Sequence, residues 1–582
     1  MEHETAPTTP PTSGQAVAGA PQGLARALPI LRWLPTYQRA WLRLDLVAGF
    51  TIWGLLIPEG IAYAALAGLP AQAGLYTLLA SLAAYAIFGS SRHLVVAGTS
   101  ASAILIASTV TVFALQDKTR YLELAAALVL CVGVLFLLAW LFRMGFITQF
   151  LSRPVMDGFI FGLAIFVMVS QLPKLFGVSG GEGNTLQKLF HVIASLGQTN
   201  VVTLLIGAAG LALLFAIDRY MPRIPGGLVV LALGILVGTL WSVASRYGVA
   251  IVGPVPAGLP SIRLPTDVGL QDYWVLLPSA VGIVLVVFSE AIGAAENFAQ
   301  KHGYEIDSNQ DLLAFAIANL GSGLLGGLVA GGSTSQTAVN DGAGARTQVS
   351  TLVAAGLALI TVVALTFLFT NLPEAILAAL IIHAVSHLLK VRQMRRYFAL
   401  ERPEFWIGMI ALFGVILIDV LPGLIIAVVA SLLILIYRVS RPQGAILGHA
   451  PETPNVYTGI DRHPENQTVP GVLIFRLNAA LFYANASVMR DRVRELVGAT
   501  TPPVHTVVID LSANDQLDIT SAEILAQLVD ELRKEGVKTV FAEVHQPVRD
   551  LMARLDASNV MTDDAVFPSV NAAVRALQET AS

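Results

Sequence analysis

Long runs of apolar residues recur through most of the chain, and they restrict the folds that it can adopt. Val349–Thr370 contains no charged residue, and Ala125–Phe142 contains none either. A helix of about 20 apolar residues spans the hydrocarbon core of a bilayer, and in lipid only helices and closed barrels satisfy their own backbone polar groups. Charged residues make up 13% of the 582 residues, against roughly 25% in soluble proteins. The sequence therefore predicts a polytopic α-helical membrane protein.

Fourteen hydrophobic segments can be counted along the chain. They lie near residues 45–66, 71–89, 94–113, 121–142, 155–176, 200–220, 226–246, 274–298, 312–330, 335–347, 349–371, 374–390, 404–420 and 421–438. The third and the tenth are interrupted by Gly, Ser and Thr, so each interruption is third in a set of seven. Because seven is odd, the second set must run with inverted topology. We predict a seven-plus-seven inverted repeat, in which Pro422 and Gly423 make the last pair either a tight hairpin or a re-entrant unit.

The two interruptions are alike in sequence. Val95–Ala103 contains the string VAGTSASA, and Val329–Ala338 reads VAGGSTSQTA. Matching interruptions in the two halves of a transporter mark half-helices that meet near the middle of the bilayer. The start of a helix exposes unpaired N–H groups and a partial positive charge, which suit a small anion. The pattern predicts an anion site between two half-helices, in a membrane carrier for anions.

Eight residues of the interruptions make up the predicted anion site, because hydroxyl, amide and backbone N–H groups can replace part of an anion's hydration shell without a fixed full charge. They are Thr99, Ser100, Ser102, Ser333, Thr334, Ser335, Gln336 and Thr337. The alternative is close helix packing, in which small residues are common. Packing is the better interpretation of one such cluster alone, whereas two clusters at corresponding positions favour a binding site.

Two carboxylates lie inside apolar segments, Glu59 in IPEGIAY and Glu290 in VVFSEAIG. Charge at membrane depth is costly, and acids there usually serve a function. We predict that Glu290 couples transport to protons and that Glu59 shares the proton or binds a cation such as sodium. Alternatively, each is a neutral, hydrogen-bonded acid with no role in transport. Tyr63 lies one helical turn after Glu59, where it either lines the anion site or packs in the core.

The placement of Lys and Arg predicts the orientation in the membrane. Arginines precede the first segment, and Lys390 and three arginines follow the twelfth. We therefore expect a multi-pass protein of the cell membrane with both termini in the cytosol. The single cysteine, Cys131, excludes an intramolecular disulfide. The sequence has no strongly basic surface, so it does not indicate nucleic acid as a partner.

Changes in composition predict the domain boundaries. Residues 1–32 are expected to be a disordered cytosolic tail, residues 33–441 the transmembrane domain, and residues 442–470 a polar linker that contains proline. Residues 471–582 alternate strand patterns, such as GVLIFRL and VHTVVIDLS, with helical patterns near 487–497, 521–534, 548–556 and 570–578. This alternation predicts a soluble α/β domain.

His383 and His387 stand four residues apart, a spacing that can hold zinc on one face of a helix. The glutamate of the metalloprotease motif is missing between them, and the sequence indicates no third ligand. A structural histidine pair is therefore the better interpretation. We predict no metal site and no cofactor.

Several long strings resemble the sulfate permease (SulP) family, the bacterial and plant relatives of the solute carrier 26 anion transporters. The string GFTIWGLLIPEGIAYAALAGLPAQAGLY is similar to the first span of that family, and GSTSQTAVNDGAGARTQVS is similar to its tenth. The string FSEAIGAAENFAQKHGYEIDSNQDLLAFAIANLGSGLLGG is similar to its eighth and ninth segments. The C-terminal residues resemble the STAS domain of the family. The resemblance implies a substrate-carrying core, a gate, elevator-like alternating access and a homodimer.

Three positions are informative within this resemblance. Glu290 matches an acidic position of the family, whereas the family frequently has Arg in place of Gln336 and often Gln in place of Glu59. The C-terminal string DQLDITSAEIL is similar to the loop that carries a phosphorylatable Ser in anti-sigma-factor antagonists. Ile519 stands where that Ser would fall, so Asp518 and Thr520 are expected to cap the next helix instead.

The function predicted from the sequence is secondary active transport of a small inorganic anion, with proton-coupled sulfate uptake as the best single choice. Bicarbonate, chloride and dicarboxylate transport or exchange are alternatives within the same family. An anion channel and a membrane-tethered regulator are alternatives of other classes. An enzyme is not predicted, because the sequence contains no nucleotide-binding loop, metalloprotease motif or nucleophile elbow.

Overall fold

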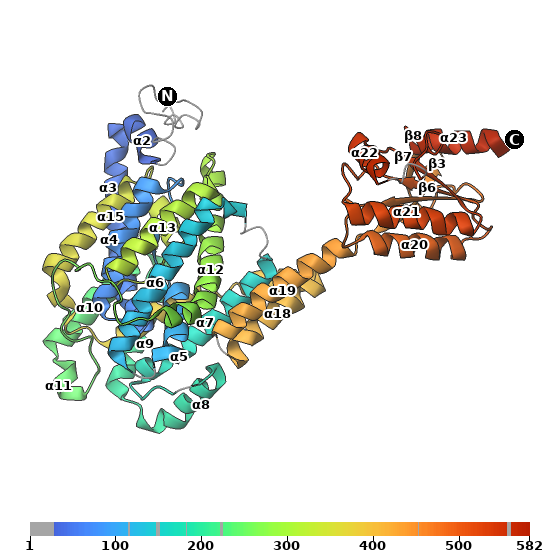
Figure 1. The fold of residues 1–582 in the computed structure, drawn as a ribbon. Helices are drawn as coiled ribbons and strands as arrows, with labels where there is room; N and C mark the ends of the chain where they lie inside the picture. Colours follow the sequence, from blue (N-terminus) through green and yellow to red (C-terminus); the bar gives the residue numbers. More distant parts are fainter. Residues whose placement is uncertain are drawn as a thin grey trace, which may run out of the picture. The chain divides into compact units, whose positions relative to one another are not determined.

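Two compact units make up the chain, an N-terminal unit (Met1–Ser431) and a C-terminal unit (Leu432–Ser582) (Figure 1). The structure is a computed structural model. It describes residues 28–114, 117–146, 152–181, 183–221, 225–418, 420–451, 453–555 and 560–581. Most of the tail predicted for residues 1–32 therefore lies outside the described residues.

The first seven predicted segments are helical. They are α3 (Arg39–Leu66), α4 (Ala71–Phe88), α5 (Ser100–Ala114), α6 (Lys118–Leu141), α7 (Arg153–Phe176), α9 (Val201–Tyr220) and α10 (Gly226–Leu240). Short elements accompany them: α2 (Ile30–Trp33), η1 (Leu34–Thr36), α8 (Thr185–Ser195), η3 (Leu196–Gln198) and α11 (Val243–Tyr247). Polar side chains begin several of these helices. Asp117 accepts backbone N–H groups at the start of α6, and Asn200 does so for α9, as expected of N-cap residues.

The second seven segments are helical as well. They are α12 (Leu270–His302), α13 (Ser308–Leu324), α14 (Thr334–Gly342), α15 (Val349–Ile360), α16 (Glu374–Ser386), α18 (Arg402–Leu417) and α19 (Val420–Ser440). Helix α15 continues through the π-helical η4 (Thr361–Leu365) and the 3-10 helix η5 (Thr366–Phe369), and α17 (Val391–Leu400) follows α16. Within the described residues, eight helices are long and apolar enough to cross a membrane.

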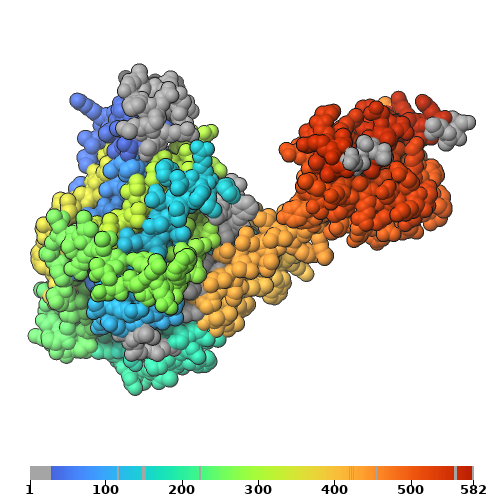
Figure 2. All heavy atoms as spheres, in the orientation of Figure 1, coloured from blue at the N-terminus to red at the C-terminus, as the bar shows by residue number. Residues whose placement is uncertain are grey.

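Helix packing follows the predicted repeat. Helix α6 packs on α13, and the helices seven segments away from them, α15 and α4, also pack together. The same holds for α7 with α18 and α9 with α16, and for α3 with α15 and α6 with α12. An exchange of the two halves therefore preserves the main contacts, as an inverted repeat requires. Segments from both halves share one outer face of the N-terminal unit, where blue, cyan and green atoms lie side by side (Figure 2).

A two-stranded sheet joins the two interrupted segments. Strand β1 (Val96–Gly98) pairs antiparallel with β2 (Ala330–Gly332), with Ala97 opposite Gly331. Helix α5 begins directly after β1, and α14 begins directly after β2. At about 1.5 Å per residue, α5 is about 22 Å long and α14 about 14 Å, so neither spans the roughly 30 Å of hydrocarbon. The two half-helices predicted from the sequence are thus confirmed.

The C-terminal unit contains a six-stranded sheet of order β4-β3-β5-β6-β7-β8. Its strands are β3 (Gly444–Ala450), β4 (Thr453–Gly459), β5 (Val472–Leu477), β6 (Thr506–Asp510), β7 (Lys538–Ala542) and β8 (Val566–Phe567). Strands β5 to β8 run parallel, and β3 is antiparallel to both β4 and β5. The helices are α20 (Ala486–Ala499), α21 (Ile519–Lys534), α22 (Gln546–Arg554) and α23 (Val570–Ala581). Helix α23 covers one face of the sheet, and α20 and α21 cover the other (Figure 1).

The linker predicted for residues 442–470 is not a separate segment. Strands β3 and β4 lie within it and extend the sheet past β5. Leu447 of β3 is buried against Ile474 of β5 and Val574 of α23. Pro442, Pro451 and Pro454 and the many polar residues suggested a linker, but a strand at the edge of a sheet tolerates both proline and polar residues.

Candidate anion-binding site

The short sheet has its outer edges satisfied by side chains. Ser81 of α4 donates its hydroxyl to the carbonyl of Val96, at 2.8 Å. On the other edge, Asn319 of α13 accepts the N–H of Ala330 at 2.9 Å and donates to its carbonyl at 3.1 Å. Sheet edges at membrane depth need such partners, because lipid offers none. The two half-helices are therefore held in a fixed relation to α4 and α13.

Two glycines bring the sheet close to α12. A Cβ atom placed on Gly331 would lie 2.8 Å from Val287 Cγ1, and one on Gly332 would lie 2.8 Å from Ala291 Cβ. Both distances are below normal contact, so this approach requires glycine. Val287 and Ala291 flank Glu290 on the same helix. The glycines of β2 thus place it against the turn of α12 that carries Glu290.

The start of α5 leaves two backbone donors unpaired. Thr99 and Ser102 cap the helix reciprocally: the N–H of Ser102 donates to Thr99 Oγ1, and the N–H of Thr99 donates to Ser102 Oγ, both at 3.1 Å. The N–H groups of Ser100 and Ala101 have no hydrogen-bond partner among the described residues. Ser102 is fully buried, so its hydroxyl serves the cap, while the unpaired amides remain available to a ligand.

The start of α14 resembles that of α5 in its unpaired donors, but its cap is one-way rather than reciprocal. Ser333 caps the helix and accepts the N–H of Gln336 at 3.5 Å. Thr337 is fully buried and donates to the carbonyl of Ser333 at 2.6 Å. The N–H groups of Thr334 and Ser335 find no partner within the described part of the chain. Both of these side chains are exposed, unlike the other residues predicted for the site.

Gln336 connects the second half-helix to Glu59 of α3. Its Nε2 donates to Glu59 Oε2 at 2.7 Å and approaches the carbonyl of Gly98 at 3.4 Å. Its Oε1 is buried and has no partner among the described groups. Tyr63 is 5% exposed and lies within electrostatic range of both Glu59 and Glu290. The structure therefore brings Tyr63 and both predicted acids to the region of the half-helices.

Glu290 differs from Glu59 in its surroundings. It is half-buried and makes no hydrogen bond or ion pair with any residue that the structure describes. Lys390, which is itself paired with Asp157 at 3.2 Å, lies within electrostatic range. Glu59 accepts a hydrogen bond from the Gln336 amide, whereas Glu290 has no hydrogen bond with a described residue. The two acids are therefore not hydrogen-bonded to each other.

The structure separates the predicted residues into two kinds. Ser102 and Thr337 hold the backbone, and Thr99 and Ser333 cap the half-helices. The backbone amides of Ser100, Ala101, Thr334 and Ser335 have no hydrogen-bond partner among the described residues. Ala101 was missed by sequence reasoning, which looked for polar side chains. The position of a residue after an N-cap is the signal that could have identified it.

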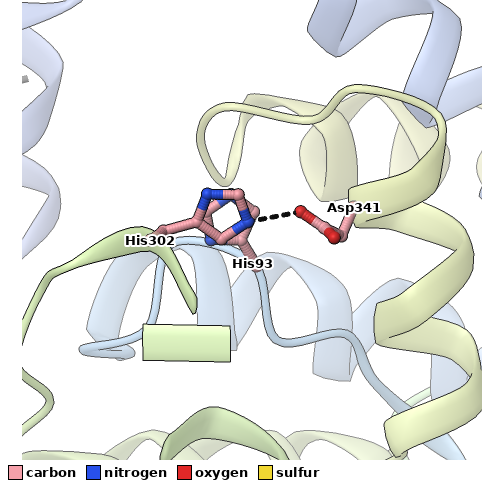
Figure 3. A group of neighbouring side chains, drawn as sticks. All are labelled: His93, His302 and Asp341. Carbon is pink, nitrogen blue, oxygen red and sulfur yellow. Dashed lines mark hydrogen bonds and ion pairs between the residues drawn. The ribbon is translucent and has the colours of Figure 1, made fainter. Parts of the chain in front are cut away.

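A second polar cluster lies at the C-terminal end of α14. Asp341 accepts hydrogen bonds from Lys301 at 2.5 Å and from His302 at 2.6 Å. The ring of His302 stacks on that of His93, with centroids 4.3 Å apart (Figure 3). Burial, with a contribution from His302, lowers the pKa of His93 to about 4. The cluster thus connects the loop before β1, which contains His93, and the end of α14, which contains Asp341, with the end of α12 at His302.

Comparison with known proteins agrees with this architecture. The model of the sulfate permease family matches residues 42–411, and the model of the STAS domain matches residues 463–573. A probable sulfate transporter of Mycobacterium tuberculosis is 35% identical over 543 residues, which cover 93% of this chain and 96% of that protein. The chain belongs to the sulfate permease family. As a member of this family, it is a multi-pass membrane protein that transports anions and carries a C-terminal STAS domain.

Solved structures share the fold of this family member. Murine solute carrier 26 family member A9, an anion transporter in the inward-facing state, matches with a TM-score of 0.88 at 23% identity, over 98% of this chain and 96% of that one. The transmembrane domain of the cyanobacterial bicarbonate transporter BicA matches with a TM-score of 0.58 at 22% identity, over 68% of this chain and 98% of that one. These similarities support the seven-plus-seven architecture.

Proposed function

We propose that this family member takes up sulfate together with protons by elevator-like alternating access. One observation carries the proposal: four backbone N–H groups, from Ser100, Ala101, Thr334 and Ser335, lie at the starts of two half-helices joined by one sheet and have no partner in the described part of the chain. Helix starts favour anions through these amides and through their dipole. We choose sulfate among the anions because the relative of which the match covers 96% is named a probable sulfate transporter.

A site of amides and hydroxyls suits a carrier. Thr99, Ser100 and Ser333 line the half-helix starts with hydroxyl groups, and Thr334 and Ser335 add exposed ones. Gln336 stands where the family frequently has arginine, so no permanent cation accompanies the anion. Its amide is already bonded to Glu59. The anion would then be held weakly enough to be released on the other side of the membrane.

A proton bound at Glu290 would compensate the charge of the entering anion. A carboxylate that is half-buried and without a hydrogen bond to the described residues is poorly stabilised at membrane depth. Protonation removes its repulsion of sulfate. Glu59 accepts a hydrogen bond from Gln336, so we assign it the secondary role.

Two groups of helices support an elevator-like motion. Helices α5 and α14 pack on α3, α6 and α12. Helices α7, α9, α16 and α18 pack mainly on one another. We propose that the first group moves as the substrate-carrying core against the second group as the gate. We also propose a homodimer with cytosolic termini, as the family resemblance and the positions of Lys and Arg suggest.

Uptake of radiolabelled sulfate into proteoliposomes tests this function. With the membrane potential held at zero, one proton per sulfate and a gradient of about two pH units allow roughly 100-fold accumulation, since 1.4 kcal/mol corresponds to tenfold. Glu290→Gln should abolish this accumulation but keep sulfate–sulfate exchange, because glutamine resembles the protonated acid. Glu296→Gln is the matched control, since Glu296 is an exposed carboxylate on the same helix.

The outcomes separate the alternatives. Accumulation of bicarbonate or a dicarboxylate without sulfate would keep the site and overturn the substrate. Rapid flux without accumulation of any anion would indicate a channel. Unchanged accumulation in Glu290→Gln would contradict the assigned role of this residue.

A further inference from the structure

Three potential metal ligands converge where α9 and α16 end. Asp218 of α9 lies 165 residues before His383 in the chain. Its Oδ2 is 2.9 Å from His383 Nε2 and 3.4 Å from His387 Nε2. The sequence indicated no third ligand for the histidine pair, because Asp218 is remote in sequence. The packing of α9 on α16 supplies that ligand.

The distances from Asp218 to the two imidazoles are close to those between the ligands of a tetrahedral site. Zinc–ligand bonds of 2.0–2.2 Å place neighbouring ligand atoms about 3.3 Å apart. The two separations from Asp218, 2.9 and 3.4 Å, lie on either side of this value, and all three ligand atoms lie within 4.8 Å of one another. The rings of His383 and His387 are nearly perpendicular, at 86°. The planes of two perpendicular rings intersect, so an ion beside Asp218 can lie in both planes.

The cluster of His93, His302 and Asp341 is a useful comparison. Its ligand atoms lie within the same limit, but its two rings are stacked at an angle of 16° (Figure 3). A metal ion must lie in the plane of each imidazole that binds it, and two stacked rings do not share such a point. The ammonium group of Lys301 also occupies the second oxygen of Asp341. The stacked cluster is therefore unsuited to an ion.

We propose that Asp218, His383 and His387 form a binding site for a divalent transition-metal ion. Two imidazoles and one carboxylate are the ligands of open zinc sites, and the same donors suit other late first-row divalent ions. The side chain of His383 is 14% exposed, whereas those of Asp218 and His387 are 44% and 54% exposed. An ion can thus enter from outside, and water can occupy a fourth position.

The bound ion would clamp α9 to α16. The ring of Phe215, also on α9, packs edge-on against the ring of His383, with their centroids 5.0 Å apart. The hydroxyl of Ser386 donates to the carbonyl of His383 at 2.7 Å and steadies the end of α16. The clamp joins two helices of the group that we assign to the gate. The binding itself does not depend on that assignment.

Metal binding by the purified full-length protein tests the proposal. The protein is prepared with a tag that contains no histidine, stripped with a chelator and titrated with Co²⁺, whose visible spectrum reports tetrahedral coordination, and then with Zn²⁺ by calorimetry. We expect one ion per chain. His387→Gln and Asp218→Asn should each weaken binding by about 10–100-fold or more, since even the outer partners of metal ligands contribute that much.

Matched variants make the result unambiguous. His302→Gln removes a histidine of the stacked cluster and should keep full binding at the proposed site. Zn²⁺ should raise the unfolding temperature of the unmodified protein and of His302→Gln, but not that of His387→Gln. Failure of the unmodified protein to bind Co²⁺ or Zn²⁺ would overturn the proposal. Binding that survives His387→Gln and Asp218→Asn but is lost in His302→Gln would overturn it as well.

Discussion

His93 illustrates how one buried side chain can make this protein sensitive to acid. It lies in the loop between α4 and β1 and is 3% exposed. Its Nδ1 is 3.2 Å from the hydroxyl of Tyr304, and its Nε2 is buried without a hydrogen bond to any described group. Burial is the main cause that lowers the pKa of His93 to about 4, aided by His302 and Arg92 and opposed by Asp341 and the backbone of Ala345.

The sign of the pH dependence follows from this shift. An unfolded histidine has a pKa of about 6.5, so between pH 6.5 and about 4 the unfolded chain binds more protons at His93 than the folded protein does. The stability that His93 contributes is therefore complete above pH 6.5 and is lost as the pH falls toward 4. We expect His93→Gln to make the fall in unfolding temperature between pH 7 and pH 5 shallower.

Tryptophan fluorescence of the detergent-solubilised protein during heating, at pH 7, 6 and 5, measures this effect. His463→Gln is the control, because His463 lies in the C-terminal unit with about half of its side chain exposed, at 51%. That variant should show the same pH dependence as the unmodified protein. Parallel curves for His93→Gln and the unmodified protein would rule out the role given to His93.

At the scale of elements, the two-stranded sheet is the feature on which the candidate site depends. Strands β1 and β2 contain three residues each, and a hydrogen-bonded pair this short has little stability by itself. Contacts with Ser81, Asn319 and α12 hold it. Any displacement of β2 from α12 would also displace the start of α14 from Glu290.

Gly331→Ala tests this dependence. The added methyl group would lie 2.8 Å from Val287 Cγ1, so either β2 or α12 must shift. Overpacking of this kind costs about 1–3 kcal/mol. We expect sulfate uptake by proteoliposomes to fall about tenfold or more, since 1.4 kcal/mol corresponds to a factor of ten.

Gly356→Ala provides the matched control for this change. Gly356 lies in α15, and a Cβ atom there would meet nothing within 4 Å. Because alanine also favours helix over glycine, this variant should be as stable as the unmodified protein and equally active. Equal activity of Gly331→Ala and Gly356→Ala would show that the close approach of β2 to α12 is not needed.

Sequence reasoning identified the half-helices but not the sheet between them. Ser and Thr at the start of an apolar run mark an N-cap, and the structure confirms helices that begin at Ser100 and Thr334. The pairing of Ala97 with Gly331 leaves no such signal, because three residues carry no alternating pattern. The partners of Asn319 and Gln336 depend on helices far away in sequence, which periodicity does not locate.

At the scale of the whole molecule, the inverted repeat could be read from the sequence, while one domain boundary could not. The count of seven and seven rests on apolar length, which the membrane imposes on every segment. The start of the C-terminal unit is determined by strand pairing instead. Strand β3 holds Ala445 and Leu447 in the core of the sheet, although its surroundings in sequence are polar and contain proline.

This placement predicts that the C-terminal unit is incomplete without the residues that look like a linker. A fragment of residues 443–582 should be soluble and melt cooperatively, whereas residues 471–582 should melt at least about 10 °C lower or aggregate. Removal of β3 exposes the edge of β5 and the contacts of Leu447, which is 1% exposed and contributes about 2 kcal/mol. Each kcal/mol corresponds to about 4–8 °C in a domain of 60–100 residues and to about 2–4 °C in one of 150–250 residues, and the two fragments lie between these sizes. Circular dichroism during heating and size-exclusion chromatography measure both effects.

Leu447→Ala in the longer fragment should reproduce part of the loss, and Val456→Ala should not, because Val456 is 47% exposed on β4. Equal melting temperatures of the two fragments would instead show that residues 443–470 act as a linker.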